Sequence, residues 1–262
     1  MTRRRITLFA ASAIIVLAVM AGGAKALRAI YVPPIIMYHS INYTDDRSNK
    51  LVVSPEKFAE QMYFLARRGY NVVPLRIMAK LIRDAEEVPY KTLSITFDDG
   101  FEDNYRYAYP VLKNIGIPAT IFVITDFIGK DGYLSWEQVR EMSESGIISI
   151  ESHTRTQPWL TSLEEKALDE EVVGSKKILE ERLKKDVHIL SYPMGNYNDT
   201  VRDAVRRAGY EAAVATNPGK NSSFSDIFAL KRQRISNSSN SMFVFWVESS
   251  GYYTFIKEHR DD

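Results

Sequence analysis

Cysteine is absent from this chain of 262 residues. Its absence excludes disulfide bridges, thiolate zinc sites, cysteine nucleophiles and a lipid-modified N-terminal cysteine. The chain also lacks an excess of charge of either sign, since 34 basic and 33 acidic residues give a formal charge of +1. Nothing in this balance indicates nucleic-acid binding through bulk electrostatics, so we expect no nucleic-acid partner.

The N-terminus carries a segment of the export type. Three arginines at residues 3–5 precede an apolar run at residues 6–23, and a small-x-small pattern follows at residues 24–26. This order is typical of a signal peptide, and the run is also nearly long enough for an uncleaved membrane anchor. We therefore predict a signal peptide or membrane anchor at residues 1–26. Residues 27–262 should form one extracytoplasmic domain, either secreted or anchored to the cell membrane.

The remaining chain alternates short apolar runs with helix-like segments. Its strands are nearly continuous in apolar residues, which indicates a mainly parallel sheet covered by helices. About seven or eight strand–helix units favour an α/β barrel over an open sheet. Helices are predicted at residues 54–69, 104–116, 135–146, 162–185 and 199–210. We expect capping boxes at Ser135/Gln138 and Ser162/Glu165, and a kink at Pro110 inside the second helix.

Polar side chains stand where the predicted strands end. In parallel α/β folds, functional groups collect at the carboxyl ends of strands. Five separate strands contribute such residues here, namely His39, Asp98 with Asp99, His153, the loop at residues 192–197, and Arg232. This pattern predicts an active site at the mouth of a barrel.

The stretch TFDDG, residues 96–100, places two adjacent carboxylates at the end of a buried strand. Buried neighbouring carboxylates repel each other and lose hydration, and a bound cation removes both penalties. One carboxylate could then bind a metal while the other acts as a base on water. The motif alone leaves another interpretation open, in which Asp99 or Asp103 caps the helix that follows.

Two histidines are the remaining candidates for chemistry. His153 follows a strand and opens a Ser/Thr-rich turn, where a metal ligand is common, but Gln157 occupies the position of an expected second ligand. His39 lies in an apolar strand, where a lone histidine is often only packed and hydrogen-bonded. His188 and His259 are expected to be structural or solvated.

The ordered motifs TFDDG, SHT (residues 152–154) and YPMGNYN (residues 192–198) resemble the polysaccharide deacetylases of carbohydrate esterase family 4, also called the NodB-homology family. The opening MYHS, residues 37–40, resembles the extracytoplasmic branch of that family. The resemblance extends over about residues 34–236. It implies a distorted, NodB-like (β/α) barrel that removes N-acetyl groups from amino-sugar polymers with one divalent metal ion.

The resemblance also implies catalytic roles. Asp98 matches the catalytic base of the family, and His39 matches the catalytic acid of members that carry this histidine at the front of the domain. Arg232 matches an arginine that orients the base.

Metal-binding and substrate-binding roles follow in the same way. Asp99 and His153 match the first and second metal ligands, whereas the third, a histidine in the family, is Gln157 here. The backbone N–H of Met194 matches an oxyanion-binding group, and Tyr192 in the same loop is a further substrate-binding candidate. Zn²⁺ is the expected metal, with Mn²⁺, Co²⁺ or Ni²⁺ as alternatives, because an amide oxygen is a poorer zinc donor than imidazole.

Glu151 is a second departure from the family pattern. It stands two residues before His153, and side chains two apart on a strand share one side. Glu151 could therefore reach the metal or merely fill space.

These observations predict a monomer that hydrolyses N-acetyl groups of peptidoglycan, poly-N-acetylglucosamine or a chitin-like polymer. If the N-terminal segment is not cleaved, the cytoplasmic membrane is a second partner. Gln157 supports one alternative, a catalytically degenerate carbohydrate-binding or scaffold protein on the same fold.

Overall fold

The computed structural model describes seven segments of the chain, residues 22–23, 25–28, 30–46, 49–84, 87–216, 226–236 and 241–253. The predicted signal peptide or anchor lies almost entirely outside them. In these seven segments, no helix has both the length and the apolar character needed to cross a membrane.

Seven parallel strands form the main sheet in the order β10-β1-β5-β6-β7-β8-β9. Their side chains are largely buried, which agrees with the near-continuous apolar runs in the sequence. A short strand, β4 (Asn71–Val72), pairs with the start of β5, and β2 (Ser40–Ile41) pairs separately with β3 (Val52–Val53). The seven strands are β1 (Ile35–Tyr38), β5 (Thr92–Phe97), β6 (Ala119–Val123), β7 (Ile148–Ser152), β8 (Ile189–Ser191), β9 (Ala212–Val214) and β10 (Gln233–Arg234).

The sheet curls until its two edges share one segment of chain. Leu230 forms a parallel bridge with Val214 of β9, and β10, three residues later, pairs with β1. Residues 230–234 therefore link the last strand of the order to the first. The predicted α/β fold with a distorted barrel of seven or eight parallel strands is confirmed as a curled, barrel-like sheet of seven.

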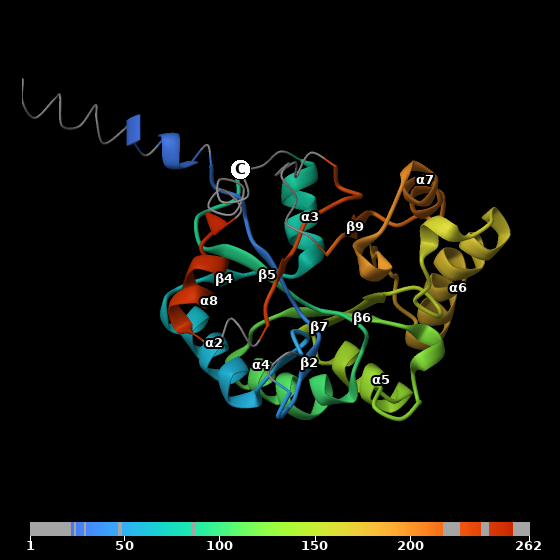
Figure 1. Cartoon of the computed structure of the whole chain (residues 1–262), viewed down its shortest axis with the longest axis horizontal. Helices are drawn as coiled ribbons and strands as arrows, with labels where there is room; N and C mark the ends of the chain where they lie inside the picture. The colour runs from blue at the N-terminus through green and yellow to red at the C-terminus, as the bar shows by residue number, and fades with distance from the viewer. Residues whose placement is uncertain are drawn as a thin grey trace, which may run out of the picture.

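Helices surround the outside of this sheet (Figure 1). Their apolar faces pack on the strands, and α2, for example, buries Phe58, Met62 and Leu65. The outer helices are α2 (Pro55–Arg67), α4 (Tyr109–Ile115), α5 (Trp136–Glu144), α6 (Glu165–Leu183), α7 (Asp199–Arg207) and α8 (Met242–Ser249).

Most predicted helix ends are confirmed. The capping box of α5 is present, with Gln138 N–H donating to Ser135 Oγ and Ser135 N–H to Gln138 Oε1. Pro110 has the expected effect in a modified form, because a π-helical turn (Asn104–Ala108) precedes α4. A proline offers no N–H to the carbonyl four residues earlier, and a wider turn accommodates that loss.

The predicted start of α6 is wrong. Ser162 belongs to a 3₁₀ turn, η3 (Leu160–Ser162), and its hydroxyl donates to the Trp159 carbonyl at 2.7 Å. The helix begins only at Glu165, and its N-cap Glu164 makes no side-chain capping bond. The predicted capping box of Ser162 and Glu165 therefore does not form, because the serine is already engaged in the preceding turn.

Helix α3 (Leu75–Arg83) closes the barrel where the strands begin. Its Leu75 and Met78 pack against side chains of the lumen, including Phe122 of β6. Its Arg76 forms an ion pair at 2.7 Å with Glu211, which directly precedes β9. Apolar side chains thus occupy much of the lumen where the strands begin, and α3 covers that end.

Glu151 of β7 points toward the closed end of the barrel. Its Oε2 accepts the backbone N–H groups of His188 and Ile189, both at 2.8 Å, beside a cavity of about 400 Å³. The carboxyl therefore lies away from the mouth, and of the two possibilities left by the sequence the structure favours the one without contact to a metal. His188 has a structural environment, since its ring lies 3.1 Å from Glu211.

The buried Glu151 carboxyl makes stability depend on pH. Burial raises its pKa from 4.5 to about 8, although the two backbone N–H groups act in the opposite direction. Folding therefore binds a proton between these values, so the stabilising contribution is complete below pH 4.5 and is lost as the pH rises through 8.

We expect Glu151→Gln to be more stable than the parent at about pH 9 by roughly 1–3 kcal/mol, with a smaller difference at about pH 5. Urea denaturation at both pH values measures this difference. Exposed Glu144 on α5 provides the control Glu144→Gln. Parallel pH profiles of the parent and Glu151→Gln would contradict the assignment.

Candidate active site

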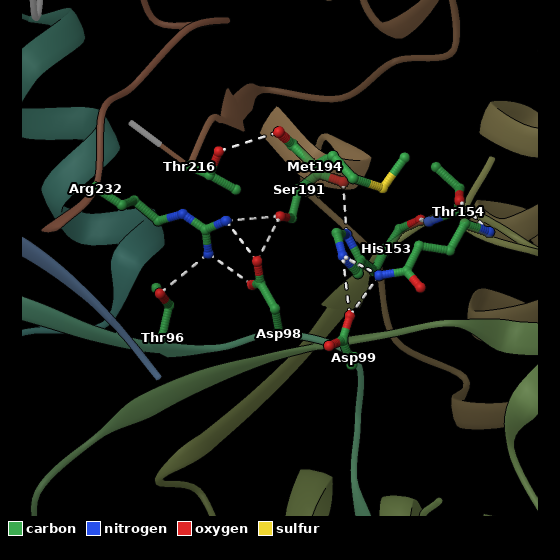
Figure 2. Close-up of polar contacts among 11 residues, drawn as sticks. Thr96, Asp98, Asp99, His153, Thr154, Ser191, Met194, Thr216 and Arg232 are labelled. Atoms are coloured by element: carbon green, nitrogen blue, oxygen red, sulfur yellow. Dashed lines mark hydrogen bonds and ion pairs between the residues drawn. The ribbon is translucent and has the colours of Figure 1, made fainter. Parts of the chain in front are cut away.

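Asp98 and Arg232 form a buried ion pair at the mouth of the barrel (Figure 2). Each carboxylate oxygen of Asp98 accepts a guanidinium N–H at 2.6 Å. The remaining guanidinium groups donate to Thr96 Oγ1, Ser191 Oγ and the Ala215 carbonyl. Both residues are only 1% exposed, so the pair survives because its hydrogen-bonding groups are matched by fixed partners.

This pairing keeps Asp98 ionised. Burial alone would raise the pKa of its carboxyl, but the charge of Arg232, aided by His153, holds that pKa well below its usual range. Each carboxylate oxygen has two acceptor sites, and Oδ1 uses one for Arg232. Asp98 therefore remains able to accept a proton or hydrogen bond from a group in the mouth, although the guanidinium lowers its basicity.

The backbone turns sharply immediately after Asp98. Asp99 and Gly100 both have a φ of 72°, in the left-handed region. A Cβ on Gly100 would lie 2.9 Å from Val123 Cγ1, so this position requires glycine. The turn separates the two carboxylates, because Asp98 faces Arg232 while Asp99 faces His153. Asp99 does not take the alternative role of a helix cap, because its carboxylate contacts His153 and Gln157.

His153 is held by Ser191. Its Nδ1 lies 2.8 Å from the Ser191 carbonyl, which fixes the ring so that Nε2 points toward Asp99 Oδ1 at 3.4 Å. Burial lowers the pKa of His153, but the hydrogen bond with Asp99 and the charge of Asp98 outweigh it and raise the pKa above its ordinary value. Ser191 thus contacts both halves of the site, through its hydroxyl on one side and its carbonyl on the other.

Gln157 lies between these two groups. Its Nε2 donates to Asp99 Oδ1 at 2.6 Å and lies 3.4 Å from His153 Nε2. The amide nitrogen therefore contacts the two atoms that the sequence assigns to metal binding. Its backbone φ of 59° is left-handed, and its side chain lines the pocket at the mouth.

A set of hydrogen bonds fixes the loop that carries Gln157. Glu171 of α6 accepts the backbone N–H groups of Arg155 and Thr156 at 2.8 and 2.9 Å. The Arg155 side chain in turn pairs with Asp126 at 2.7 Å. These contacts hold the loop from outside the pocket, so the scaffold helps to set the position of Gln157.

The donor atoms around Gln157 fit a divalent cation in part. Among the described residues, His, Asp and Glu side chains supply two ligands, Asp99 and His153, and no group of three. Their donor atoms are 3.4 Å apart, close to the edge of about 3.4 Å of a tetrahedral site with bonds of about 2.1 Å. Gln157 completes a set of three only if its amide turns to present oxygen in place of nitrogen.

His39 lies at the same mouth but is not locked into a structural role. Its Nδ1 is buried and has no hydrogen-bond partner among the described residues. Burial lowers the pKa of the ring, and the charges of Asp98 and Asp99 oppose this shift only partly. Its backbone carbonyl is fixed by Asn104 Nδ2 at 2.8 Å. The ring therefore faces the pocket with a held backbone and an unsatisfied nitrogen.

The two predicted substrate-binding residues of the loop after β8, Met194 and Tyr192, lie in different places. Met194 lines the pocket, with a left-handed φ of 52° and its carbonyl accepting from Thr216 at 3.2 Å. Tyr192 is fully buried in the outer core, where its hydroxyl donates to the Phe228 carbonyl. Its side chain therefore does not reach the pocket, contrary to the predicted contact with substrate.

The structure thus brings most predicted residues into one cavity of about 380 Å³ at the mouth. Its walls include His39, Asp98, Asp99, His153, Gln157 and Met194, with Arg232 directly behind Asp98. Ser191 is a site residue that the sequence analysis does not predict. Its position in β8 could have indicated this role, because it lies on the same inward side of the strand as Ile189.

Comparison with known proteins identifies the family. The sequence model described as Polysaccharide deacetylase matches residues 85–213. YxkH of Bacillus subtilis (strain 168), a protein named as a polysaccharide deacetylase, is 38% identical over 217 residues, covering 82% of this chain and 76% of the relative. The chain belongs to the polysaccharide deacetylases. This deacetylase is accordingly an enzyme of the carbohydrate deacetylase class.

Two further relatives of the deacetylase are informative. The structure titled Streptococcus pyogenes deacetylase PplD in complex with acetate has a TM-score of 0.74 and 30% identity, covering 81% of this chain and 96% of that one. A poly-beta-1,6-N-acetyl-D-glucosamine N-deacetylase of Staphylococcus aureus (strain MSSA476) is 28% identical over 170 residues. That match covers 60% of the deacetylase, which spans 58% of the relative.

The ion pair at the centre of the site makes a prediction about stability. Arg232→Gln leaves the Asp98 charge buried without a partner, and we expect a loss of about 3–5 kcal/mol in the free energy of unfolding. Adding Asp98→Asn should cost little more, because no charge then remains unpaired. Urea denaturation of both single variants and the double variant measures this coupling.

Arg76 supplies the matched control. It also pairs with a carboxylate at 2.7 Å, but its side chain is 51% exposed. Arg76→Gln should cost less than about 1 kcal/mol. Equal losses for Arg76→Gln and Arg232→Gln would contradict the importance given to the buried pair.

Proposed function

We propose that this deacetylase removes N-acetyl groups from an extracytoplasmic amino-sugar polymer with one divalent cation. The observation that carries the proposal is the placement of ionised Asp98 beside the Asp99, His153 and Gln157 donor cluster in a single pocket. Asp99, His153 and the side-chain oxygen of Gln157 would hold the cation. Zn²⁺ is the first candidate, followed by Mn²⁺, Co²⁺ and Ni²⁺.

A cation at this position would polarise the acetamide carbonyl and make a nearby water more acidic. Asp98 receives the proton of the attacking water, while Arg232 keeps the carboxylate oriented. The Met194 backbone N–H, at the rim of the pocket, stabilises the charge that develops on the carbonyl oxygen. The products are acetate and a free amine on the sugar.

His39 is the proposed acid for the departing amine. Its lowered pKa makes the imidazolium form a stronger proton donor, while the negative charges of Asp98 and Asp99 help to form it. The partnerless Nδ1 leaves the ring without a competing structural bond. A packed histidine would have that nitrogen satisfied, so the geometry favours the acid role over the structural one.

The polymer itself is proposed from chemistry and relationship together. The Staphylococcus aureus relative is named for poly-beta-1,6-N-acetyl-D-glucosamine, which supports an N-acetylated glycan as substrate. A predicted export segment at residues 1–26, followed by one catalytic domain at residues 27–262, supports action outside the cytoplasmic membrane. Peptidoglycan, poly-N-acetylglucosamine and chitin-like polymers all present the required acetamide.

Metal removal provides the direct test. Chelation should abolish acetate release by the purified full-length deacetylase from N-acetylated oligosaccharides, and addition of a divalent cation should restore it. Gln157→His should bind Zn²⁺ at least about tenfold more tightly, because imidazole is the stronger zinc donor. Asp98→Asn should lower acetate release about a hundredfold or more while metal binding persists.

Dye competition measures zinc affinity independently of activity, and circular dichroism checks that each variant is folded. Asn114→His on α4, an exposed position, controls for an added histidine outside the pocket. Acetate release by Gln157→His alone would instead favour a degenerate site in the parent chain. The absence of acetate from every variant and glycan, with metal in excess, would favour the carbohydrate-binding role.

A further inference from the structure

Arg234 stands at the rim of the pocket, one step outward from the buried ion pair. It belongs to β10 and pairs in register with Met37 of β1. Side chains two residues apart on a strand share a side, so Arg234 lies on the same side as Arg232. It also lines the 380 Å³ cavity that contains Asp98 and His39. Residues 232–234 thus supply two guanidinium groups to the mouth, one buried and one at the rim.

The two arginines differ in what they contact. The guanidinium of Arg232 is fully engaged, whereas the side chain of Arg234 is exposed and has no ion pair or hydrogen bond to the described residues. The carboxylates of the pocket are already occupied, since Asp98 pairs with Arg232 and Asp99 accepts from Gln157. Within the described part of the chain, therefore, no carboxylate at the mouth neutralises the positive charge of Arg234.

The deacetylation reaction does not require this charge. The acetamide group is neutral, and Asp98, His39 and the cation site account for its chemistry. An exposed arginine can simply be solvated, but the other exposed residues of this rim, Leu51 and Met194, are apolar. A guanidinium presented among apolar groups at the entrance of a pocket is well suited to bind a carboxylate in a two-pronged hydrogen bond.

We propose that Arg234 binds a carboxylate carried by the glycan on, or next to, the sugar whose acetyl group is removed. The deacetylase then selects acidic N-acetylated glycans over neutral ones. This inference rests on the proposed function and adds the class of substrate to it. Glycans with a lactyl ether on the amino sugar carry such a group, and so do those with uronic acid as the neighbouring sugar.

Binding to the chelator-treated full-length protein tests the proposal without catalysis. Three soluble oligosaccharides of equal length serve as probes, a chitin oligomer, a peptide-free peptidoglycan oligomer with lactyl carboxylates, and a hyaluronan oligomer with uronic acid. Calorimetry should give tighter binding for at least one acidic probe than for chitin. In Arg234→Gln, the ratio of acidic to neutral affinity should fall about tenfold to a hundredfold.

Two controls make the result specific. Arg207→Gln on α7 removes the same charge from an exposed position outside the pocket and should leave the ratio unchanged. Amidation of the glycan carboxylate should reproduce the effect of Arg234→Gln in the parent protein. Added salt should weaken the acidic preference, because the guanidinium is exposed. The acidic probe that loses more affinity in Arg234→Gln shows whether Arg234 binds a lactyl carboxylate or a uronic acid.

The outcomes separate this inference from the proposed function. An unchanged ratio in Arg234→Gln, or equal binding of all three probes by the parent, overturns the role of Arg234 even if acetate is released. Selective binding of an acidic probe that depends on Arg234, without acetate release after metal is restored, supports the role of Arg234 and overturns the hydrolytic proposal.

Discussion

The pairing of Asp98 with Arg232 is the interaction on which the rest of this structure depends. Two charges at 1% exposure are costly unless every polar atom around them is matched. Their partners come from different strands, Thr96 on β5, Ser191 on β8 and Ala215 just after β9. The register of these strands must therefore be correct before the pair is stable, so barrel geometry and the chemistry of the site constrain each other.

The two ends of the lumen differ in polarity. Apolar side chains and α3 occupy the end where the strands begin, with Glu151 as a buried carboxyl there, and the polar groups of the pocket collect where the strands end. Positive φ values are frequent at the mouth, where Asp99, Thr154, Gln157 and Met194 have them, although Lys91 before β5 and Lys184 at the end of α6 have them elsewhere. Strained backbone persists where surrounding contacts over-determine it, as the bonds of Glu171 do for the Gln157 loop.

The sequence predicts the barrel and most of the pocket because both depend on local patterns. Apolar runs locate the strands, and the polar residues that end them identify His39, Asp98, Asp99, His153 and Arg232. Orientation is harder, as Tyr192 illustrates. It directly follows inward-facing Ser191, so alternation turns it outward, but this inference needs the end of β8 to within one residue.

Contacts between distant segments are the part that local patterns do not contain. Glu171 fixes the loop that carries Gln157, which lies fourteen residues earlier in the chain. No local sequence pattern indicates that these two segments are in contact. The amide of Gln157 likewise contacts Asp99 across 58 positions. The predicted start of α6 is wrong for a related reason, because Ser162 suits both a helix cap and a 3₁₀ turn, and packing of the preceding loop decides between them.

The segment at residues 230–234 has a consequence for the order in which the enzyme is completed. It joins β9 to β1 and carries the guanidinium that neutralises Asp98. A chain folded only as far as β9 has an open seam and a carboxylate without its counterion. Closure of the sheet and ionisation of Asp98 are therefore coupled. A chain that is still folding has a complete pocket only once β10 has paired with β1.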